Sequence, residues 1–280
     1  NTPTLTSSLG INRTAVAISS GNSHTCAILD DGTVSCWGRN SDGRLGDGTT
    51  TDRYTPTKIS SLGTGRTAVA ISSGDDHTCA ILDDGTVSCW GQNLFGRLGD
   101  GTTTDRNIPT QTSSFGTGRT AVAISSGGWH NCAILDDGSV SCWGYNSRGQ
   151  LGDGTTTQRN TPTQTSSLGT GRTAVAISMS GSHHTCAILD DGSVSCWGYN
   201  NRGQLGDGTT SDSNIPTQTS SLGTGRTAVA ISSGKYHTCA ILDDASVKCW
   251  GNNDNGQLGD GTTTNRNTPT QTSSLGTGRT

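Results

Sequence analysis

The chain has 280 residues, of which 41 are glycine and only 29% are apolar, so a single thick hydrophobic core is not available to it. All 22 acidic residues are Asp and only three of the 18 basic residues are Lys, which removes the residues that favour exposed helix surfaces and excludes a helical protein. The net charge of −4, without a cluster of Lys or Arg, indicates no nucleic-acid partner, and no apolar run is long enough for membrane insertion. There is no signal peptide and the chain begins at Asn1 rather than Met, so we expect a processed or excised segment.

Five near-identical repeats organise the sequence. The segment Thr-Ala-Val-Ala-Ile-Ser recurs with a period of about 53 residues, starting at Thr14, Thr67, Thr120, Thr173 and Thr227. We therefore divide the chain into repeat units 14–66, 67–119, 120–172, 173–226 and 227–280. A terminal segment, residues 1–13, precedes them and duplicates the sequence of residues 267–279.

Each unit contains the pattern of four short strands. In the first unit, residues 14–19 are short and apolar, and residues 24–29 and 33–37 alternate on either side of an acidic turn at 30–32. A glycine-punctuated loop then leads to residues 55–57, where a proline restricts the fourth strand to a sheet edge. Such a sheet cannot bury both of its faces alone, so neighbouring units have to stack sheet on sheet. The predicted fold is an all-β β-propeller of five four-stranded antiparallel blades.

One motif recurs in every unit with the same order and spacing. In the first unit it consists of His24, the turn glycine Gly32, the pair Trp37-Gly38, Asn40 and the loop 43–46. This motif resembles the repeat of the regulator of chromosome condensation family, and the resemblance covers all five units. It implies a propeller, typically of seven blades, that acts as a platform for protein interactions; members include a nucleotide-exchange factor and a secreted bacterial β-lactamase inhibitor. Because the binding residues of each member lie in variable loops, the resemblance predicts the fold and no particular partner.

The ten cysteines form five pairs, each with a separation of ten residues. A three-residue hairpin loop at 30–32 places Cys26 directly opposite Cys36 on the neighbouring strand. Opposed Cβ atoms lie about 4.5 to 5.5 Å apart, so a small pucker closes a disulfide. We predict disulfides between Cys26 and Cys36, Cys79 and Cys89, Cys132 and Cys142, Cys186 and Cys196, and Cys239 and Cys249. Such disulfides indicate an oxidising, extracellular or cell-surface setting.

Metal sites are the alternative for the same residues. His24 lies two residues before Cys26, which gives each unit a His-Cys-Cys cluster, but structural zinc takes four ligands and the cluster supplies three. The Asp-Asp-Gly and Gly-Asp-Gly-Thr sequences lack the ligand pattern of an EF-hand and are typical of turns, with weak calcium binding left as an alternative. We interpret the histidines at 24, 77, 130, 184 and 237 as buried structural residues and the repeated Trp as packing between blades. No catalytic residue, metal or cofactor is therefore predicted.

Differences between the units are concentrated in two loops. They are the two residues before each repeated His and the four residues after each Trp-Gly pair. Equivalent loops on every blade lie on one face of a propeller, and here they carry residue types that are favoured at binding hot spots. This predicted interaction face consists of Phe95, Trp129, Tyr145, Arg148, Tyr199, Arg202, Lys235 and Tyr236. Neutral drift in exposed loops after a recent duplication is the competing explanation.

Two hypotheses for the function follow from these patterns. The first is a non-enzymatic extracellular binding or scaffold protein whose partner is another protein. The second is a structural subunit of a longer self-associating assembly or surface filament, since near-identical units and ends in matching phase suit an array of copies. Five units fall two short of the usual seven, so the blades could form a closed ring, an open arc, or a propeller completed by another chain. We expect the segment 1–13, which competes with 267–279 for one edge-strand position, to link chains.

Overall fold

The computed structural model describes residues 9, 10, 12–181 and 183–274, which form twenty strands and no helix. The strands make five separate four-stranded antiparallel sheets, each built from four consecutive strands. The predicted all-β fold with five four-stranded blades is thereby confirmed. Within the same described residues there is no helix with the length and hydropathy that a membrane crossing needs.

The sheets are numbered here as blades 1 to 5 in chain order. Blade 1 consists of β1 (Ala15–Ser20), β2 (His24–Leu29), β3 (Val34–Gly38) and β4 (Arg53–Lys58). Blade 2 consists of β5 (Ala68–Ser73), β6 (His77–Leu82), β7 (Val87–Gly91) and β8 (Arg106–Gln111). Blade 3 consists of β9 (Ala121–Ser126), β10 (His130–Leu135), β11 (Val140–Gly144) and β12 (Arg159–Gln164). Blade 4 consists of β13 (Ala174–Ser180), β14 (His184–Leu189), β15 (Val194–Gly198) and β16 (Ser213–Gln218). Blade 5 consists of β17 (Ala228–Ser233), β18 (His237–Leu242), β19 (Val247–Gly251) and β20 (Arg266–Gln271).

The hairpin between the second and third strands of each blade has the predicted three-residue loop. In blade 1 the N–H of Leu29 donates to the carbonyl of Thr33 at 2.8 Å, and the N–H of Gly32 donates to the carbonyl of Leu29 at 2.9 Å. Gly32 has a φ of 73°, in the left-handed region that favours glycine. In this register Cys26 lies opposite Cys36, so the register predicted from the turn is confirmed.

The hydrophobic core is divided into four thin layers, one between each pair of successive blades. In the first layer, Ile28 and Val34 of blade 1 pack against Leu82 and Trp90 of blade 2. Equivalent residues make the other three layers. The repeated Trp residues of blades 2 to 5 are fully buried, and Trp37 of blade 1 is partly exposed because no blade precedes it in the described chain. Stacking of blades, rather than any single sheet, therefore provides the core.

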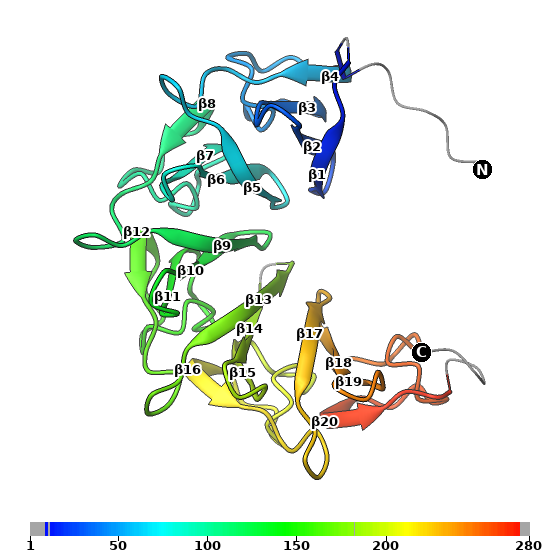
Figure 1. The fold of residues 1–280 in the computed structure, drawn as a ribbon. Coiled ribbons are helices and arrows are strands. Elements are labelled where there is room, and N and C mark those ends of the chain that lie inside the picture. Colours follow the sequence, from blue (N-terminus) through cyan, green and yellow to red (C-terminus); the bar gives the residue numbers. More distant parts are fainter. Residues whose placement is uncertain (1–8, 11, 182, 275–280) are drawn as a thin grey trace.

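The five blades follow one another around an open arc, with the first strands on the inside and the fourth strands on the outside (Figure 1). Successive first strands are neighbours from β1 to β17, whereas β1 and β17 face each other across a gap. Of the arrangements considered for five units, a closed five-bladed ring is thus not formed. The exposed fraction of Ile241 in blade 5 is 44%, compared with 2% for its equivalent Ile28, because no further blade covers it. Most of the terminal segment expected to link chains, residues 1–8 and 11, lies outside the described residues, as do residues 275–279 of its duplicate.

Candidate functional site

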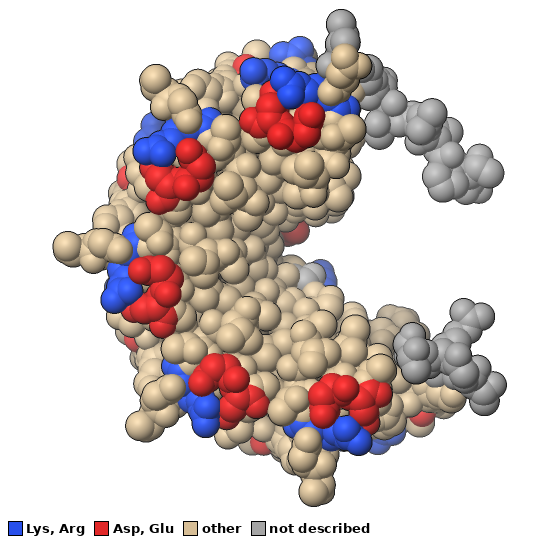
Figure 2. Space-filling view, viewed as in Figure 1, with Lys and Arg blue, Asp and Glu red and all other residues tan. Residues whose placement is uncertain are grey.

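The two variable loops of each blade lie at one end of its strands. The loop between the first and second strands and the loop after the third strand meet at the end opposite the hairpin between the second and third strands, because the sheet is antiparallel. Figure 2 shows the face with the hairpins, where each blade carries a cluster of acidic and basic side chains. In blade 2 this cluster is Arg66 with Asp83 and Asp84, the closest atoms being Nη2 and Oδ2 of Asp84 at 2.7 Å. The interaction face lies on the other side of the arc.

Aromatic rings on the interaction face contact one another across four blades. Phe95 of blade 2 lies 4.8 Å from Tyr145 and 5.6 Å from Trp129 between ring centroids. Trp129 is edge-on to His183 of blade 4 at 6.0 Å, and His183 stacks on Tyr236 of blade 5 at 5.5 Å with an interplanar angle of 5°. Stacked and edge-on ring pairs stabilise one another beyond the area that they bury. We call these rings the aromatic belt: Phe95, Trp129, Tyr145, His183, Tyr199 and Tyr236.

Basic side chains lie on the rings of the belt. The guanidinium of Arg148 is 5.0 Å from the centroid of Tyr199, and the ammonium of Lys235 is 5.3 Å from the centroid of Tyr236. Cations at these distances are attracted to the negative face of the ring. Arg202 does not join these contacts within the described residues, and it pairs with Asp254 at 3.5 Å.

Sequence reasoning missed two members of this face. His183 occupies the position before the repeated His of its unit, as Trp129 and Tyr236 do in the neighbouring units, and this equivalence is the signal that could have identified it. Arg97 lies over the ring of Phe95 at 5.5 Å while its side chain is fully buried, and its Nη1 donates to the carbonyl of Gly128 in the next blade at 3.1 Å. Three of the units have Gln at the position equivalent to Arg97, so the repeat sequence alone does not predict the contact of Arg97 with Phe95.

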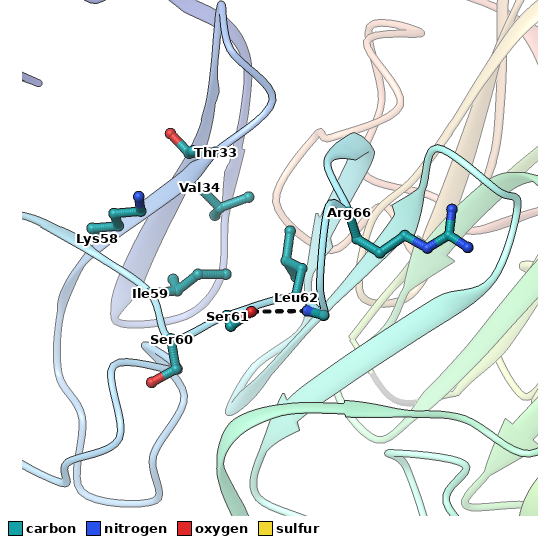
Figure 3. A pocket seen from close by; sticks show the side chains of 9 residues that line it. Thr33, Val34, Lys58, Ile59, Ser60, Ser61, Leu62 and Arg66 are labelled. Atoms are coloured by element: carbon teal, nitrogen blue, oxygen red, sulfur yellow. Dashed lines mark hydrogen bonds between the residues drawn. The ribbon is translucent and has the colours of Figure 1, made fainter.

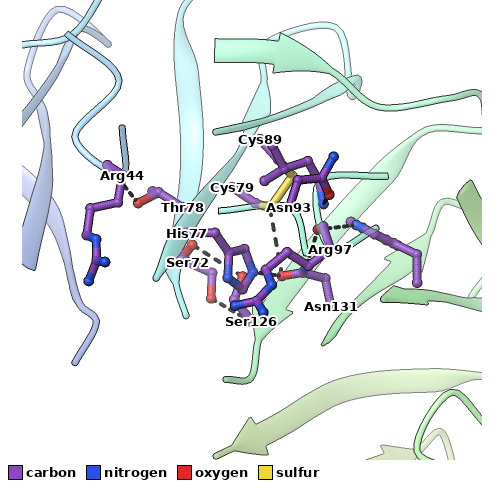
Figure 4. The surroundings of a disulfide bond; sticks show 12 residues. Arg44, Ser72, His77, Thr78, Cys79, Cys89, Asn93, Arg97, Ser126 and Asn131 are labelled. Carbon is purple, nitrogen blue, oxygen red and sulfur yellow. Dashed lines mark hydrogen bonds between the residues drawn. A yellow bond between two sulfur atoms is a disulfide. The ribbon is translucent and has the colours of Figure 1, made fainter. Parts of the chain in front are cut away.

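The loop that carries Phe95 is fixed by the following blade. The main-chain carbonyl of Arg97 accepts hydrogen bonds from Nδ2 of Asn131 at 2.6 Å and from Nε1 of Trp143 at 2.9 Å. Oδ1 of Asn131 in turn accepts a hydrogen bond from Nε2 of His77 at 2.9 Å (Figure 4). Because these groups are buried in the layer between blades 2 and 3, the loop is ordered before any partner binds.

The repeated histidines connect successive blades. Nε2 of His24 lies 2.8 Å from Oγ1 of Thr78, and this hydroxyl donates to the carbonyl of Arg44 at 3.1 Å, so His24 is the donor of the first bond. Burial lowers the pKa of His24 to about 4, with a further contribution from Arg44, and burial lowers the pKa of His77 to about 3, with a contribution from Arg97. The histidines are therefore neutral structural residues at neutral pH.

All ten cysteines form disulfides within the hairpins, with the pairing that the spacing predicts. Figure 4 shows the second of them, between Cys79 and Cys89, next to His77. The sulfur atoms of Cys79 and Cys89 are joined in the disulfide, and the ring of His77 is hydrogen-bonded to Asn131. The disulfide and this hydrogen bond therefore explain why His and Cys recur together in each unit, the pattern considered above for zinc. In the part of the chain that the structure describes, no group of three or more His, Cys or Asp side chains is arranged to hold a metal ion.

The Gly-Asp-Gly-Thr loop uses its carboxylate to hold its own chain. Asp100 accepts hydrogen bonds from the hydroxyl of Thr102 at 2.7 Å and from Nε of Arg106 at 2.8 Å. Burial opposes the ionisation of Asp100, but these hydrogen bonds outweigh it and lower the pKa of the carboxyl. Asn93, the repeated Asn of the unit, fills the centre of the loop and accepts the N–H of Leu98 at 2.9 Å. These contacts account for the loop without a calcium ion.

A small surface pocket lies beside the linker that follows the fourth strand in three of the blades. In blade 1 it is lined by Val34, Ile59 and Leu62, with Lys58 and Arg66 also in the lining (Figure 3). Equivalent pockets occur in blades 3 and 4 with Leu168 and Leu222. Residues of the linker form one wall of the pocket, and the lining as a whole is mainly aliphatic and hydroxyl side chains with one Arg and one Lys or Gln.

The face is electrostatically uneven. Burial raises the pKa of Asp75, and the neighbouring Asp76 adds to the increase, against the opposing effects of Arg97, Lys235 and Arg44. Burial also lowers the pKa of His183, and Lys235 and Arg148 lower it further. Asp76 thus disfavours the ionised form of Asp75, and Lys235 and Arg148 disfavour the protonated form of His183.

Comparison with known proteins identifies relatives of the whole chain. The RCC1-like domain matches residues 1–279. The ultraviolet-B receptor UVR8 of Arabidopsis thaliana is 34% identical over 253 residues, which cover 90% of this chain and 56% of that protein. The chain therefore spans little more than half the length of this relative.

Solved structures share the fold at lower identity. Prp20p from Saccharomyces cerevisiae, a protein with binding properties towards Gsp1p and histones, has a TM-score of 0.81 at 20% identity, covering 95% of this chain and 64% of that one. The ectodomain of the receptor kinase CR4 from Physcomitrella patens has a TM-score of 0.54 at 22% identity, covering 87% of this chain and 52% of that one. The resemblance noted in the repeat motif is confirmed, and this chain belongs to the RCC1-like domain family of β-propellers, a fold that serves as a scaffold for protein interactions.

Proposed function

We propose that this propeller is a non-enzymatic extracellular or cell-surface protein that binds a protein partner through the aromatic belt. The observation that carries the proposal is the continuity of the belt, which runs from Phe95 through Trp129 and His183 to Tyr236 in one series of ring contacts. Large amphipathic rings lose little conformational entropy on binding and dominate the energetics of protein interfaces. Rigid support from neighbouring blades lowers the cost of association further.

The pattern of substitution supports binding over neutral drift. The positions before the repeated His hold Trp129, His183 and Tyr236 in three successive units, where the first two units have Ser23 and Asp76. The three rings are therefore neighbours in space and form one surface, rather than isolated exposed side chains. An aromatic surface of this kind on a chain with few aromatic residues is typical of an interaction site.

Two observations support the extracellular setting. Five disulfides in one chain are stable in oxidising compartments and are rare in the cytosol. The ectodomain of the receptor kinase CR4 provides an extracellular example of the same fold.

A display selection tests the binding face. A random peptide library on phage is selected against the oxidised protein, and the enriched clones are compared on the variants Trp129→Ala and Tyr236→Ala. We expect the clones to lose most of their binding to both variants. Tyr54→Ala is the matched control, because Tyr54 is an exposed ring at the outer edge of blade 1, and it should leave binding unchanged. Clones that bind the belt variants as well as the unchanged protein would show that another surface is the binding site.

Self-association is the second candidate, and the uncovered face of blade 5 favours it. Ile241 is exposed there, and Ile28, Ile81, Ile134 and Ile188 are buried by the following blade at the equivalent positions. An added blade from another copy would bury the same surface, and such head-to-tail contacts extend into filaments when they do not close. Light scattering should then show a mass that rises with protein concentration and that Ile241→Asp reduces. A constant monomeric mass over a wide concentration range, unchanged by deletion of residues 1–13, would contradict it.

A further inference from the structure

The charged residues of the interaction face are divided between its two halves. In blades 1 and 2, carboxylates surround a buried guanidinium, and Nη1 of Arg44 pairs with Oδ1 of Asp76 at 2.6 Å. In blades 3 to 5, the exposed cations Arg148 and Lys235 lie over rings of the belt, and Arg202 is a third exposed cation in the loop after Trp197. Arg148 pairs with Asp212 at 3.4 Å and Arg202 pairs with Asp254 at 3.5 Å, whereas Lys235 has no ion pair with any described residue. The three cations thus outnumber the two carboxylates that pair with them, although the net charge of the chain is −4.

Cations from two blades lie over neighbouring rings of the belt. Lys235 of blade 5 lies over Tyr236, whose ring stacks on His183 of blade 4. Arg148 of blade 3 lies over Tyr199, whose ring is 5.6 Å from His183. The charged groups that act on His183 are Lys235 and Arg148, which lower its pKa, and the carboxyl of Asp75, which opposes them. The rings hold the two cations in position, and Lys235 has no ion pair with a described residue. Arg148 also pairs with Asp212 at 3.4 Å, an exposed contact that a carboxylate of the ligand would share or replace.

Such an arrangement discriminates between partners by charge. A carboxylate placed against Lys235 or Arg148 forms a charge-assisted hydrogen bond with a donor that is already in place. A basic group at the same position meets like charges, which costs binding free energy. The adjacent rings of Trp129 and Tyr236 offer apolar area to a side chain between the carboxylates.

We infer that the half of the interaction face in blades 3 to 5 binds an acidic segment of the protein partner, in which an apolar or aromatic side chain packs on the belt and flanking Asp or Glu carboxylates pair with Lys235 and Arg148. The inference rests on the proposed function, since it assigns the chemistry of the partner at the same face.

Fluorescein-labelled pentapeptides with a central Trp test this inference directly. The central residue is flanked by two residues on each side, which are Glu in the first peptide, Gln in the second and Lys in the third. Binding is measured by anisotropy at low ionic strength, where charge effects are least screened. We expect the Glu peptide to bind about tenfold more tightly than the Gln peptide, and the Lys peptide to bind most weakly. The double variant Lys235→Gln/Arg148→Gln should remove this preference.

A control variant separates local charge from net charge. Arg172→Gln removes one positive charge from the hairpin face, where Arg172 pairs with Asp190 and Asp191, and should leave the preference for the Glu peptide intact. The substituted side chains are exposed, and equal melting temperatures of the variants confirm that the fold is retained.

Each other outcome has a defined meaning. Equal binding of the Glu and Gln peptides that is lost in Trp129→Ala would overturn the inference and leave the proposed binding face in place. A preference for Glu that survives in the double variant would overturn it, because the selectivity would arise elsewhere. Absence of binding by all three peptides would also overturn it, and the display selection then decides separately whether the face binds proteins.

Discussion

A single residue distinguishes the hairpin of blade 5 from the other four. Ala245 occupies the turn position that is glycine in the other blades and has a φ of 64°, where glycine has φ values of 73° to 75°. A side chain in this region costs about 1 kcal/mol relative to glycine. Ala245→Gly should therefore raise the free energy of unfolding by about that amount, measured by denaturant unfolding of the oxidised protein.

The reverse substitution in blade 1 is the control for this prediction. A Cβ atom on Gly32 would lie 2.5 Å from the Cβ of Thr67 in the next blade, so Gly32→Ala adds a clash to the backbone strain. It should destabilise the protein more than Ala245→Gly stabilises it. An unchanged or lower stability of Ala245→Gly would mean that the turn of blade 5 has another shape in solution.

The buried histidines make the stability depend on pH. The pKa of His77, His130 and His184 falls to about 3 on folding, mainly through burial, whereas an unfolded His titrates near 6.5. The unfolded chain therefore binds more protons below pH 6.5, and stability is lost as the pH falls from about 6.5 towards 3. At pH 5 each of these residues should cost about 2 kcal/mol relative to neutral pH.

Urea unfolding at several pH values measures this loss, and His77→Gln provides the comparison. The variant lacks one titrating group, so its stability should change less steeply between pH 6.5 and 5, even though it is less stable at neutral pH. A slope identical to that of the unchanged protein would show that His77 is not buried in its neutral form.

Among the elements, the hairpin of the second and third strands is the unit that the disulfides stabilise. Each bond closes a loop with a sequence separation of 10 residues, which in the chain-entropy model stabilises the folded state by about 2 to 3 kcal/mol. The variant Cys132→Ser/Cys142→Ser, which lies in the middle of the arc, should lose about this amount of stability. The intact mass of the unchanged protein should rise by ten hydrogens on full reduction, and free thiols in the native protein would contradict the pairing.

The strands, the turn and the disulfide register could be predicted because they depend on local patterns. Alternation of apolar residues places the strands, and the three-residue loop at 30–32 fixes which cysteines face each other. The contact of His24 with Thr78 could not be predicted, because it joins residues of different units and depends on how the blades stack. The eight predicted residues of the interaction face could be identified because they stand at positions that vary between units. His183 and Arg97 could be assigned to the same face only from their contacts with Tyr236 and Phe95, which depend on how the blades stack.

For the whole molecule, the repeated contacts between blades predict tolerance of a change in the number of units. Each internal boundary uses the same layer of core residues, so removal of residues 67–119 would place blade 1 against blade 3 with an equivalent set. We expect this deletion variant to fold with a β-sheet circular dichroism spectrum and cooperative unfolding. Removal of residues 67–93 is the control, since it leaves an incomplete blade and should not fold. Loss of cooperative unfolding in the first variant would show that the boundaries are not interchangeable.

The bonds from His24 to Thr78 and from Thr78 to the carbonyl of Arg44 have a further consequence for how such a protein can evolve. The side chains that join one blade to the next are repeated in nearly every unit, and the loops after each Trp-Gly pair take part through main-chain carbonyls such as those of Arg44 and Gln204, whatever side chains the loops carry. Recombination between units can therefore lengthen, shorten or reorder the array without disturbing its joints, and each event moves a different loop next to Trp129. A surface of this kind can acquire new specificity by exchange of whole units, faster than by successive point substitutions.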